Sequence, residues 1–327
     1  MPRMSWKRLI FIASGSAAVL MNASTVCSQA YPVRPIRLVV GVSTGSAADA
    51  TARTISQKLT DVLGRAMVVE NRAGAAGAIA ADLVAKSPAD GYVLLLVTAA
   101  DTVQPALRSN LPYDLVRDFA PVSLVSIGPL LLVVNAAVPA QSVKELIALA
   151  QARPGKLSYG STGVGTMTHL AGELFKFKAK VDITHVPYKG GAESAMATAS
   201  GQIEMTFPSI PAAIPLIDAG KLRALAISGA KRVPFMPAVP TFDELGFSGY
   251  DRSSWYGVLA PAGVPRETIA RLNGAIAKVL GMPEVREALS RDGTEPQPNT
   301  PEQFAAFINR ELAQNAELIR LTGAKAE

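Results

Sequence analysis

The stretch IRLVVGVSTGS, residues 36–46, sets the pattern on which the chain is built. Its first half is a short β-branched run, typical of a buried strand, and its second half is a loop rich in glycine and hydroxyl groups. Apolar residues then recur at three- and four-residue spacing from Ala48 to Val62, just before Gly64. This spacing predicts one buried face of a helix that ends at the glycine.

Units of the same kind recur along the chain in two series. Further strands are predicted at 67–69, 92–98, 131–134, 157–159, 183–186, 203–207, 222–228 and 255–260. Helices are expected to begin at Pro265 and after Thr300, where Thr300 and Gln303 form a capping box. Strands that alternate with helices at this spacing favour parallel pairing with right-handed crossovers. We therefore predict an α/β protein with two lobes, each a mainly parallel sheet flanked by helices.

Residues 1–30 have the features of a cleaved signal peptide. Basic side chains precede an apolar stretch at 9–20, which is too short to span a bilayer comfortably. Small residues at Ser28 and Ala30 then stand at the minus-three and minus-one positions of a cleavage site. We expect cleavage after Ala30 and a soluble periplasmic protein.

Two other interpretations of this segment stay open. The apolar stretch would serve as an uncleaved anchor helix if the cleavage site were not used. Cys27 would be lipidated if the residues before it, Ser24 to Val26, acted as a lipobox, although they match that motif poorly.

Composition excludes several classes of function. The net charge is +6, and residues 1–30 carry three basic and no acidic groups, so the mature chain has +3 (6 minus 3), too little to favour nucleic acid. Cys27 is the only cysteine, and His169 and His185 are the only histidines. Disulfides, thiolate catalysis and a histidine-rich metal site are therefore not expected, and no Walker loop occurs. We expect no metal or cofactor, and a monomer.

Four loops are candidates for a binding site. In open α/β sheets, ligands bind beyond the carboxyl ends of the strands, where free N–H groups and the helix dipole favour a carboxylate. The loops at such positions that are rich in glycine or hydroxyl groups are 41–46, 98–101, 160–166 and 188–191. Each alone is consistent with an ordinary turn, but together, on an exported chain, they favour ligand binding.

Single residues in these loops have two interpretations each. Asp49 follows Ser46 at capping-box spacing, so it either caps its helix or accepts a hydrogen bond from a ligand. Lys189 is either a solvated surface cation or a ligand contact. His169 is expected to be a packed, hydrogen-bonded histidine inside a helix.

A serine hydrolase is the main rival among enzymes. Residues 41–45 match G-x-S-x-G between a strand and a helix, which would make Ser43 a nucleophile. That chemistry normally needs a histidine near the end of the chain, and none follows His185. We therefore do not expect an enzyme.

Several ordered stretches, from Tyr31 to the C-terminus, resemble the Bug family of extracytoplasmic solute receptors related to tripartite tricarboxylate transporters. They are YPVRPIRLVV (31–40), VENRAGAAG (69–77), YDLVRDFAPV (113–122), YGSTGVGT (159–166), HLAGELF (169–175), HVPYKGG (185–191) and LRALA (222–226). The first loop departs from the usual P-F-x-x-G-G pattern, because it lacks the proline, the aromatic residue and one glycine but keeps Asp49 and Arg53.

The resemblance implies a two-lobed Venus-flytrap periplasmic binding protein fold of type II. One lobe would comprise residues 31–130 and 252–327 and the other 131–251, with a hinge at crossing segments near 128–132 and 248–254. A ligand carboxylate would be held by main-chain amides, hydroxyl groups and ordered water. The positions that match are Ser43, Thr44, Gly45, Ser46, Asp49, Ala100, Asp101, Ser161, Thr162, Gly163, Gly165, Thr166, Tyr188, Lys189, Gly190 and, after the next strand, Ser209.

The function that follows is capture of a small carboxylate and its delivery to an inner-membrane permease. Dicarboxylates, tricarboxylates, acidic amino acids and aromatic acids would all suit such loops. A binding module for a sensor protein is the alternative that the same fold would serve.

Overall fold

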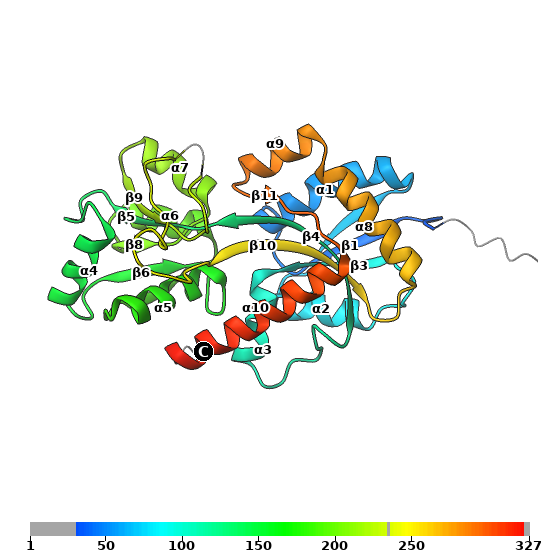
Figure 1. Cartoon of the computed structure of the whole chain (residues 1–327), viewed down its shortest axis with the longest axis horizontal. Helices are drawn as coiled ribbons and strands as arrows, with labels where there is room; N and C mark the ends of the chain where they lie inside the picture. The colour runs from blue at the N-terminus through cyan, green and yellow to red at the C-terminus, as the bar shows by residue number, and fades with distance from the viewer. Residues whose placement is uncertain (1–30, 234–235, 324–327) are drawn as a thin grey trace, which may run out of the picture. The chain divides into compact units, whose positions relative to one another are not determined.

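Two β-sheets flanked by helices make up the computed structural model, which describes residues 31–233 and 236–323 (Figure 1). From Pro32 onward the chain forms a single compact unit. The predicted signal peptide and Cys27 lie outside the described residues. None of the described helices is both long and apolar enough to cross a bilayer.

The larger sheet has the strand order β11-β4-β10-β3-β1-β2. Its strands are β1 (Ile36–Val40), β2 (Met67–Asn71), β3 (Val93–Thr98), β4 (Phe119–Pro129), β10 (Ser253–Pro261) and β11 (Glu295–Pro296). The helices in the same parts of the chain are α1 (Ala47–Leu63), η1 (Ala75–Gly77), α2 (Ala78–Ala85), η2 (Ala99–Thr102), α3 (Gln104–Leu107), α8 (Arg266–Leu280), α9 (Pro283–Arg291) and α10 (Pro301–Thr322). The C-terminal portion of the chain therefore contributes two strands to the larger sheet.

The smaller sheet has the strand order β7-β6-β8-β5-β9. Its strands are β5 (Leu131–Asn135), β6 (Ser158–Ser161), β7 (Thr184–Pro187), β8 (Met205–Thr206) and β9 (Leu222–Ile227). Its helices are α4 (Val143–Ala152), α5 (Met167–Ala179), α6 (Gly191–Ala199) and α7 (Ile210–Asp218). Figure 1 shows the long strands β4 and β10 running from the larger sheet toward the smaller one.

The α/β two-sheet class is confirmed, but the prediction that both sheets are mainly parallel is wrong. In the larger sheet β1 pairs in parallel with β2 and β3, whereas β10 is antiparallel to β3 and β4, and β11 is antiparallel to β4. In the smaller sheet β6 is parallel to β7 and β8, and β5 is antiparallel to β8 and β9. In the larger sheet the cause is the return of the chain, because β4 leaves this sheet and β10 re-enters it in the opposite direction.

Strand β4, 11 residues long, was not predicted. It contains Pro121 and Pro129, which normally confine a segment to sheet edges or to bulges. The sheet accommodates Pro121 through irregular pairing, since the register between β4 and β10 shifts between Val258 and Leu259, the partner of Pro121. Pro121 therefore indicates irregular pairing within β4 and does not exclude a strand at this position.

The predicted helix ends are confirmed where they are capped. Ser46 accepts a hydrogen bond from the N–H of Asp49 at the start of α1, and Gly64 ends that helix in the left-handed conformation. Thr300 and Gln303 form the reciprocal capping box of α10. Such caps satisfy N–H and C=O groups that have no partner within the helix.

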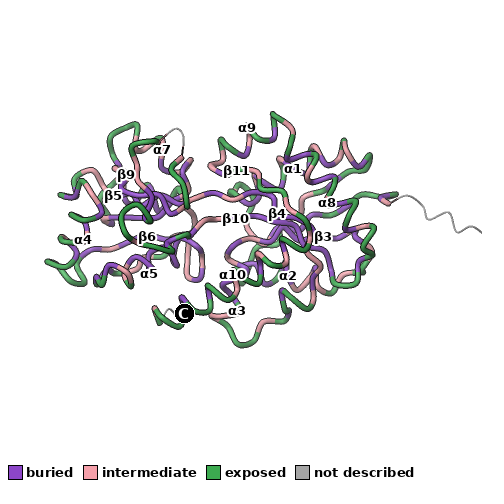
Figure 2. Tube along the Cα trace, viewed as in Figure 1, coloured by how far each residue is buried: buried purple, intermediate pink, exposed green. Residues whose placement is uncertain are grey.

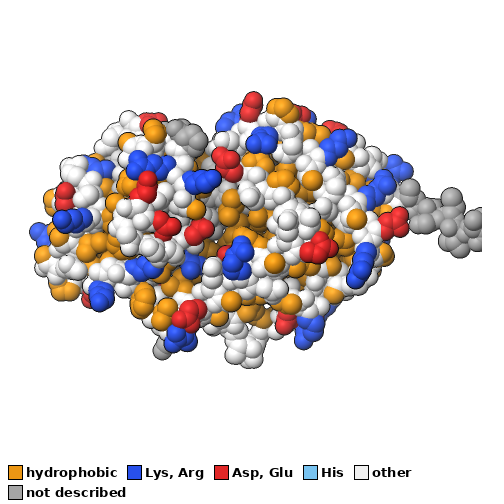
Figure 3. Space-filling view, in the orientation of Figure 1, with side chains coloured by type: hydrophobic (Ala, Val, Ile, Leu, Met, Phe, Trp, Pro, Cys, Tyr) orange, Lys and Arg blue, Asp and Glu red, His pale blue; other side chains and the backbone are white. Residues whose placement is uncertain are grey.

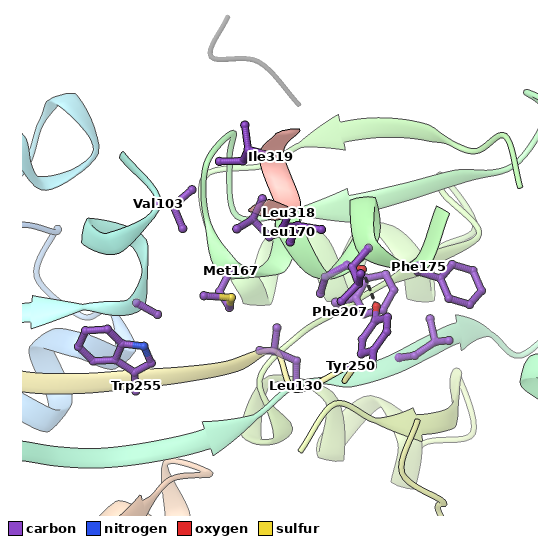
Figure 4. Close-up of a cluster of buried hydrophobic side chains, with 14 of the residues drawn as sticks. Val103, Leu130, Met167, Leu170, Phe175, Phe207, Tyr250, Trp255, Leu318 and Ile319 are labelled. Atoms are coloured by element: carbon purple, nitrogen blue, oxygen red, sulfur yellow. Dashed lines mark hydrogen bonds between the residues drawn. The ribbon is translucent and has the colours of Figure 1, made fainter. Parts of the chain in front are cut away.

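One cluster of buried apolar side chains contains residues from both sheets, including Leu95 of β3 and Leu132 of β5. Figure 2 shows that the strands of both sheets are largely buried, whereas the helices expose one side. Close to α5, the cluster brings together Met167, Leu318 and Ile319 (Figure 4). The last helix, α10, thus packs against both α3 and α5.

Candidate functional site

The first candidate loop, residues 41–46, connects β1 to α1. Its base is tightly seated, since a Cβ atom on Gly41 would lie 2.8 Å from the Cα atom of Gly77. At its tip the side chains of Ser43 and Thr44 are exposed. Within the described residues neither of these two hydroxyl groups makes a hydrogen bond, so both face solvent at the carboxyl end of β1.

Asp49 holds this loop in place from below. Its side chain is only 3% exposed, and its Oδ2 accepts hydrogen bonds from the Gly45 N–H (2.9 Å) and Arg53 Nε (3.0 Å). Its Oδ1 accepts from Asn71 Nδ2 at 2.9 Å and pairs with Arg53 Nη2 at 3.0 Å. Burial disfavours the charged form, but the bonds from Arg53, Gly45 and Asn71 outweigh it and lower the pKa of Asp49. These contacts make Asp49 a structural anchor, and its role as a ligand contact stays a prediction.

The second candidate loop follows β3 and contains Asp101. The Oδ2 atom of Asp101 accepts hydrogen bonds from the N–H and the hydroxyl of Thr98, at 2.7 and 2.8 Å. Burial raises the pKa of Asp101 to about 6, although the bonds from Thr98 oppose this shift. A Cβ atom on Gly77 would lie 3.0 Å from Asp101 Oδ1. With Gly41 against Gly77, the turns after β1, β2 and β3 therefore meet, and Ala100 lies partly exposed among them.

The third candidate loop, residues 160–166, follows β6 and is organised by its own hydroxyl groups. The hydroxyl of Thr168, one residue into α5, accepts the N–H of Thr162 at 2.8 Å. It also lies 2.9 Å from the hydroxyls of both Thr162 and Thr166. Thr166 additionally caps α5, since its hydroxyl accepts the N–H of His169. This network fixes the conformation of the loop.

The two histidines lie side by side beneath this loop. Nε2 of His185 is 2.6 Å from the buried hydroxyl of Ser161, which also accepts the N–H of Gly163 at 3.0 Å. Nδ1 of His169 accepts the N–H of Gly165 at 3.2 Å, and the two imidazole centroids are 4.3 Å apart. Desolvation, and secondly the charge of His169, lower the pKa of His185 to about 4. His185 is therefore neutral at pH 7, and the expectation of a packed His169 agrees with its burial.

The remaining predicted residues lie at the starts of α6 and α7. The N–H of Tyr188 donates to the Ser161 carbonyl at 2.9 Å, so this turn is attached to the third loop. Lys189 is exposed, and its N–H donates to Glu193 at 3.1 Å. Gly190 precedes α6. Ser209 precedes α7. It forms an isolated antiparallel β-bridge with Leu130, the residue between β4 and β5.

Loops from the two sheets come together at Gly165. A Cβ atom on Gly165 would lie 2.7 Å from Leu107 Cδ1 and 3.0 Å from Gln104 Nε2, both on α3 beside the larger sheet. Gln104 was not predicted as a site residue. A signal was present, since it is a polar residue within the apolar run Val103 to Leu107, shortly after Asp101.

Two cavities are lined by residues outside these loops. One of about 520 Å³ is lined by residues of α7 and α9, and one of about 540 Å³ lies between α5, β10 and α10. None of the predicted binding residues lines either cavity. On the face drawn in Figure 3, basic and acidic side chains are interspersed. This face therefore carries no field of one sign.

Two α/β sheets joined by long crossing strands, with polar loops from both sheets converging, define the class of two-lobed solute-binding proteins. A family model described as the tripartite tricarboxylate transporter family receptor matches residues 51–324, and the chain belongs to this family. The resemblance to Bug receptors is thereby confirmed.

The chain is similar to several known members of the family. It is 38% identical to the protein BugT of Bordetella pertussis over 97% of this chain and 96% of BugT. It also matches a solved periplasmic transporter (39% identity, TM-score 0.82), covering 90% of this chain and 99% of that one. The R. palustris protein Rpa4515, solved with adipate, has 37% identity and a TM-score of 0.82 over 90% of this chain and 99% of its own. MatC of Rhodopseudomonas palustris, solved with malate, has 30% identity and a TM-score of 0.79 over 88% of this chain and 100% of its own.

These findings make the chain a periplasmic-type solute receptor rather than an enzyme, as expected. The hydrolase alternative at Ser43 is wrong on the same ground. The geometry agrees, because His169 and His185 are engaged with Gly165 and Ser161 in the loops of the smaller sheet.

Proposed function

We propose that this protein captures a small dicarboxylate in the periplasm and delivers it to the permease of a tripartite tricarboxylate-type transporter. The observation that carries the proposal is the third loop, where the Thr162, Thr166 and Thr168 hydroxyls are fixed at the start of α5. Hydroxyl donors at a helix N-terminus suit a carboxylate, because they add hydrogen bonds to the positive end of the helix dipole. The relatives solved with adipate and malate support a dicarboxylate.

The two carboxylates of such a ligand would be shared between the sheets. The third loop would hold one carboxylate, and the exposed Ser43 and Thr44 hydroxyls, with the turn after β3, would serve the other. The remaining predicted positions, including Asp49, Tyr188, Lys189, Gly190 and Ser209, would shape or support the site. Contacts from both lobes give the ligand a higher affinity for the closed conformation, which is the conformation that a permease would recognise.

The hinge for this motion would lie where the chain crosses between the sheets, near 128–132 and 248–254. At the first crossing only Leu130 separates β4 from β5. The N–H of Leu130 donates a hydrogen bond to the Ser228 hydroxyl at 2.8 Å. The lobes proposed from the sequence, 31–130 with 252–327 and 131–251, move about this point. The protein acts as a monomer in this scheme.

The ligand is tested by thermal unfolding of the mature protein with a panel of dicarboxylates, tricarboxylates, acidic amino acids and aromatic acids. A ligand at one hundred times its dissociation constant adds about 2.7 kcal/mol of stability, which raises Tm by several degrees. Thr162→Val should reduce this shift, whereas Ser200→Ala, on an exposed residue at the end of α6, should leave it unchanged. If ligand-free protein from refolded material responds to no carboxylate, the proposal is wrong.

The location is tested separately. The protein should be recovered from the periplasmic fraction, and N-terminal sequencing should begin at Tyr31 if cleavage follows Ala30. A first residue at Cys27 carrying a lipid, or an intact N-terminus, would select one of the other two interpretations.

A further inference from the structure

Gln104 is a buried amide with nothing in the described chain to bind. Its side chain belongs to a residue that is 1% exposed at the first position of α3. Within the described residues, neither Oε1 nor Nε2 of Gln104 has a hydrogen-bond partner. Burying an amide without partners is unfavourable, and the great majority of buried polar atoms in proteins are paired. A residue that keeps both amide atoms unpaired in the core needs an explanation other than stability.

The position of Gln104 gives that explanation. A Cβ atom placed on Gly165 would lie 3.0 Å from Nε2 of Gln104, so the amide lies against the third loop. Gln104 therefore stands at the junction where an element of the larger sheet meets the loop that we propose to hold a carboxylate. Gly165 itself has φ of +75°, and its N–H is already bonded to His169. The loop backbone at this residue is thus not the group that satisfies the amide.

A second polar group on the same stretch of chain is also unpaired. The hydroxyl of Tyr113 is buried and, within the described residues, has no hydrogen-bond partner. Burial, and secondly the charge of Asp101, raise the pKa of Tyr113, so its hydroxyl remains a donor. Single unpaired buried atoms occur elsewhere in the described chain, but only Gln104 has two of them.

We infer that Gln104 contacts the bound solute directly and selects dicarboxylates that carry a hydroxyl or ammonium group beside one carboxylate. This inference rests on the proposed function and adds the substituent that the site recognises. A primary amide has two donor hydrogens and one acceptor oxygen, whereas a carboxylate only accepts. An unsubstituted dicarboxylate would satisfy the amide hydrogens but leave Oε1 unpaired. A hydroxyl or ammonium group beside the carboxylate supplies the missing donor.

The expected selectivity is large, since a site built to hydrogen-bond a substrate hydroxyl rejects the analogue that lacks it far more strongly than an apolar pocket rejects a small change in size. Succinate, malate and aspartate form a matched series, because they differ only in the group at one carbon. We expect the wild-type protein to bind malate or aspartate at least ten-fold more tightly than succinate.

The experiment is calorimetric titration of these three ligands into the mature wild-type protein, Gln104→Met and Gln104→Leu. Methionine keeps the length and flexibility of glutamine without its amide, and leucine is a second apolar variant in case one of them packs poorly. Gln151→Leu, on the exposed side of α4, is the control. Each Gln104 variant should lose the preference, with the dissociation constant for the substituted ligand rising about ten-fold more than that for succinate.

The Tm of each Gln104 variant without ligand distinguishes ligand binding by Gln104 from a stabilising role of this residue in the fold. Removal of an unpaired buried amide should leave the Tm unchanged or raise it, whereas loss of a stabilising residue would lower it. The inference is overturned if the wild type binds succinate as tightly as malate and aspartate, if the variants keep the wild-type ratio, or if the wild type binds only other carboxylates. If the wild type binds no carboxylate of the wider panel, the proposed function itself fails.

Discussion

The loop after β1 and the loop after β6 have similar compositions but opposite internal organisation. In the β6 loop the hydroxyls of Thr162, Thr166 and Thr168 contact one another, and the loop holds its own shape. In the β1 loop the Ser43 and Thr44 hydroxyls are exposed, and Asp49 supplies the order from beneath. The β6 loop is pre-formed by contacts among its own hydroxyls, whereas within the described residues the Ser43 and Thr44 hydroxyls of the β1 loop make no such contacts. Substitutions in the two loops should therefore separate effects on stability from effects on affinity.

The largest effect should come from Asp49→Ala, since it leaves the Gly45 N–H, the Asn71 amide and the Arg53 guanidinium without their shared acceptor. We expect the free energy of unfolding to fall by about 2–4 kcal/mol. Urea unfolding measures this. The control is Asp61→Ala on an exposed position of the same helix, where a change within about 0.5 kcal/mol is expected. Equal effects at the two positions would show that the first loop has no anchor.

The next effect is a matched pair of threonine substitutions. Thr168→Val leaves the Thr162 N–H unpaired and should lower the free energy of unfolding by about 1–3 kcal/mol. Thr44→Val, on an exposed side chain, should change stability by less than about 0.5 kcal/mol but weaken ligand binding. Chemical denaturation and calorimetric titration of both variants test the comparison. Equal destabilisation by Thr44→Val and Thr168→Val would contradict the proposed difference between the two loops.

His185, which contacts Ser161 of the β6 loop, and Asp101, which lies in the loop after β3, should respond to acid in opposite directions. His185 titrates near pH 4 in the folded protein but near 6.5 when unfolded, so the unfolded state binds more protons between these values and stability falls as the pH falls through them. Asp101 titrates near 6 when folded and near 3.8 when unfolded, so it adds stability as the pH falls through that range. The two contributions therefore oppose each other in the wild type.

His185→Gln isolates the histidine contribution. The stability difference between wild type and this variant should shrink by about 1–3 kcal/mol from pH 7 to pH 4, allowing for the partial exposure of the ring. Urea unfolding at several pH values gives the difference directly. A difference that stays constant with pH would mean that His185 keeps its ordinary pKa in the folded protein.

The last prediction concerns two glycines with positive φ, Gly165 and Gly220. Gly165→Ala and Gly220→Ala should each cost about 1–2 kcal/mol, because φ is +75° and +67°. Only at Gly165 does the new methyl group meet neighbours, namely Leu107 and Gln104, while nothing lies within 4 Å at Gly220. Gly165→Ala should therefore also weaken ligand binding. Equal affinities of the two variants would show that α3 and the third loop need not approach closely.

The elements that follow local rules could be predicted from the sequence. The caps at Ser46, Gly64 and Thr300 and the apolar strands are encoded by neighbouring residues, and the structure has them as expected. Strand β4 could not be predicted, because its prolines are tolerated only through pairing with β10, more than a hundred residues further along. The antiparallel pairing in each sheet escaped prediction for the same reason.

The site was predictable as a set of loops but not as a set of contacts. Composition indicates that Thr162 and Thr44 carry hydroxyl groups, but not that one bonds its neighbours while the other faces solvent. The position of Gln104 within an apolar run was a sequence signal, but its significance depends on Gly165, which is distant in sequence and adjacent in space. Contacts of this kind depend on how separate elements pack, and no local pattern records them.

The central position of β10 has a consequence for the biogenesis of the protein. This strand lies between β3 and β4 and pairs with both, so the larger sheet is divided into two halves until residues 253–261 are present. Pairings between segments so far apart form slowly, because the entropy of closing a long loop is lost before the contacts between the strands can form. Folding of this sheet is therefore delayed during synthesis, because the sheet is completed only after residues 253–261, near the end of the chain, have been made.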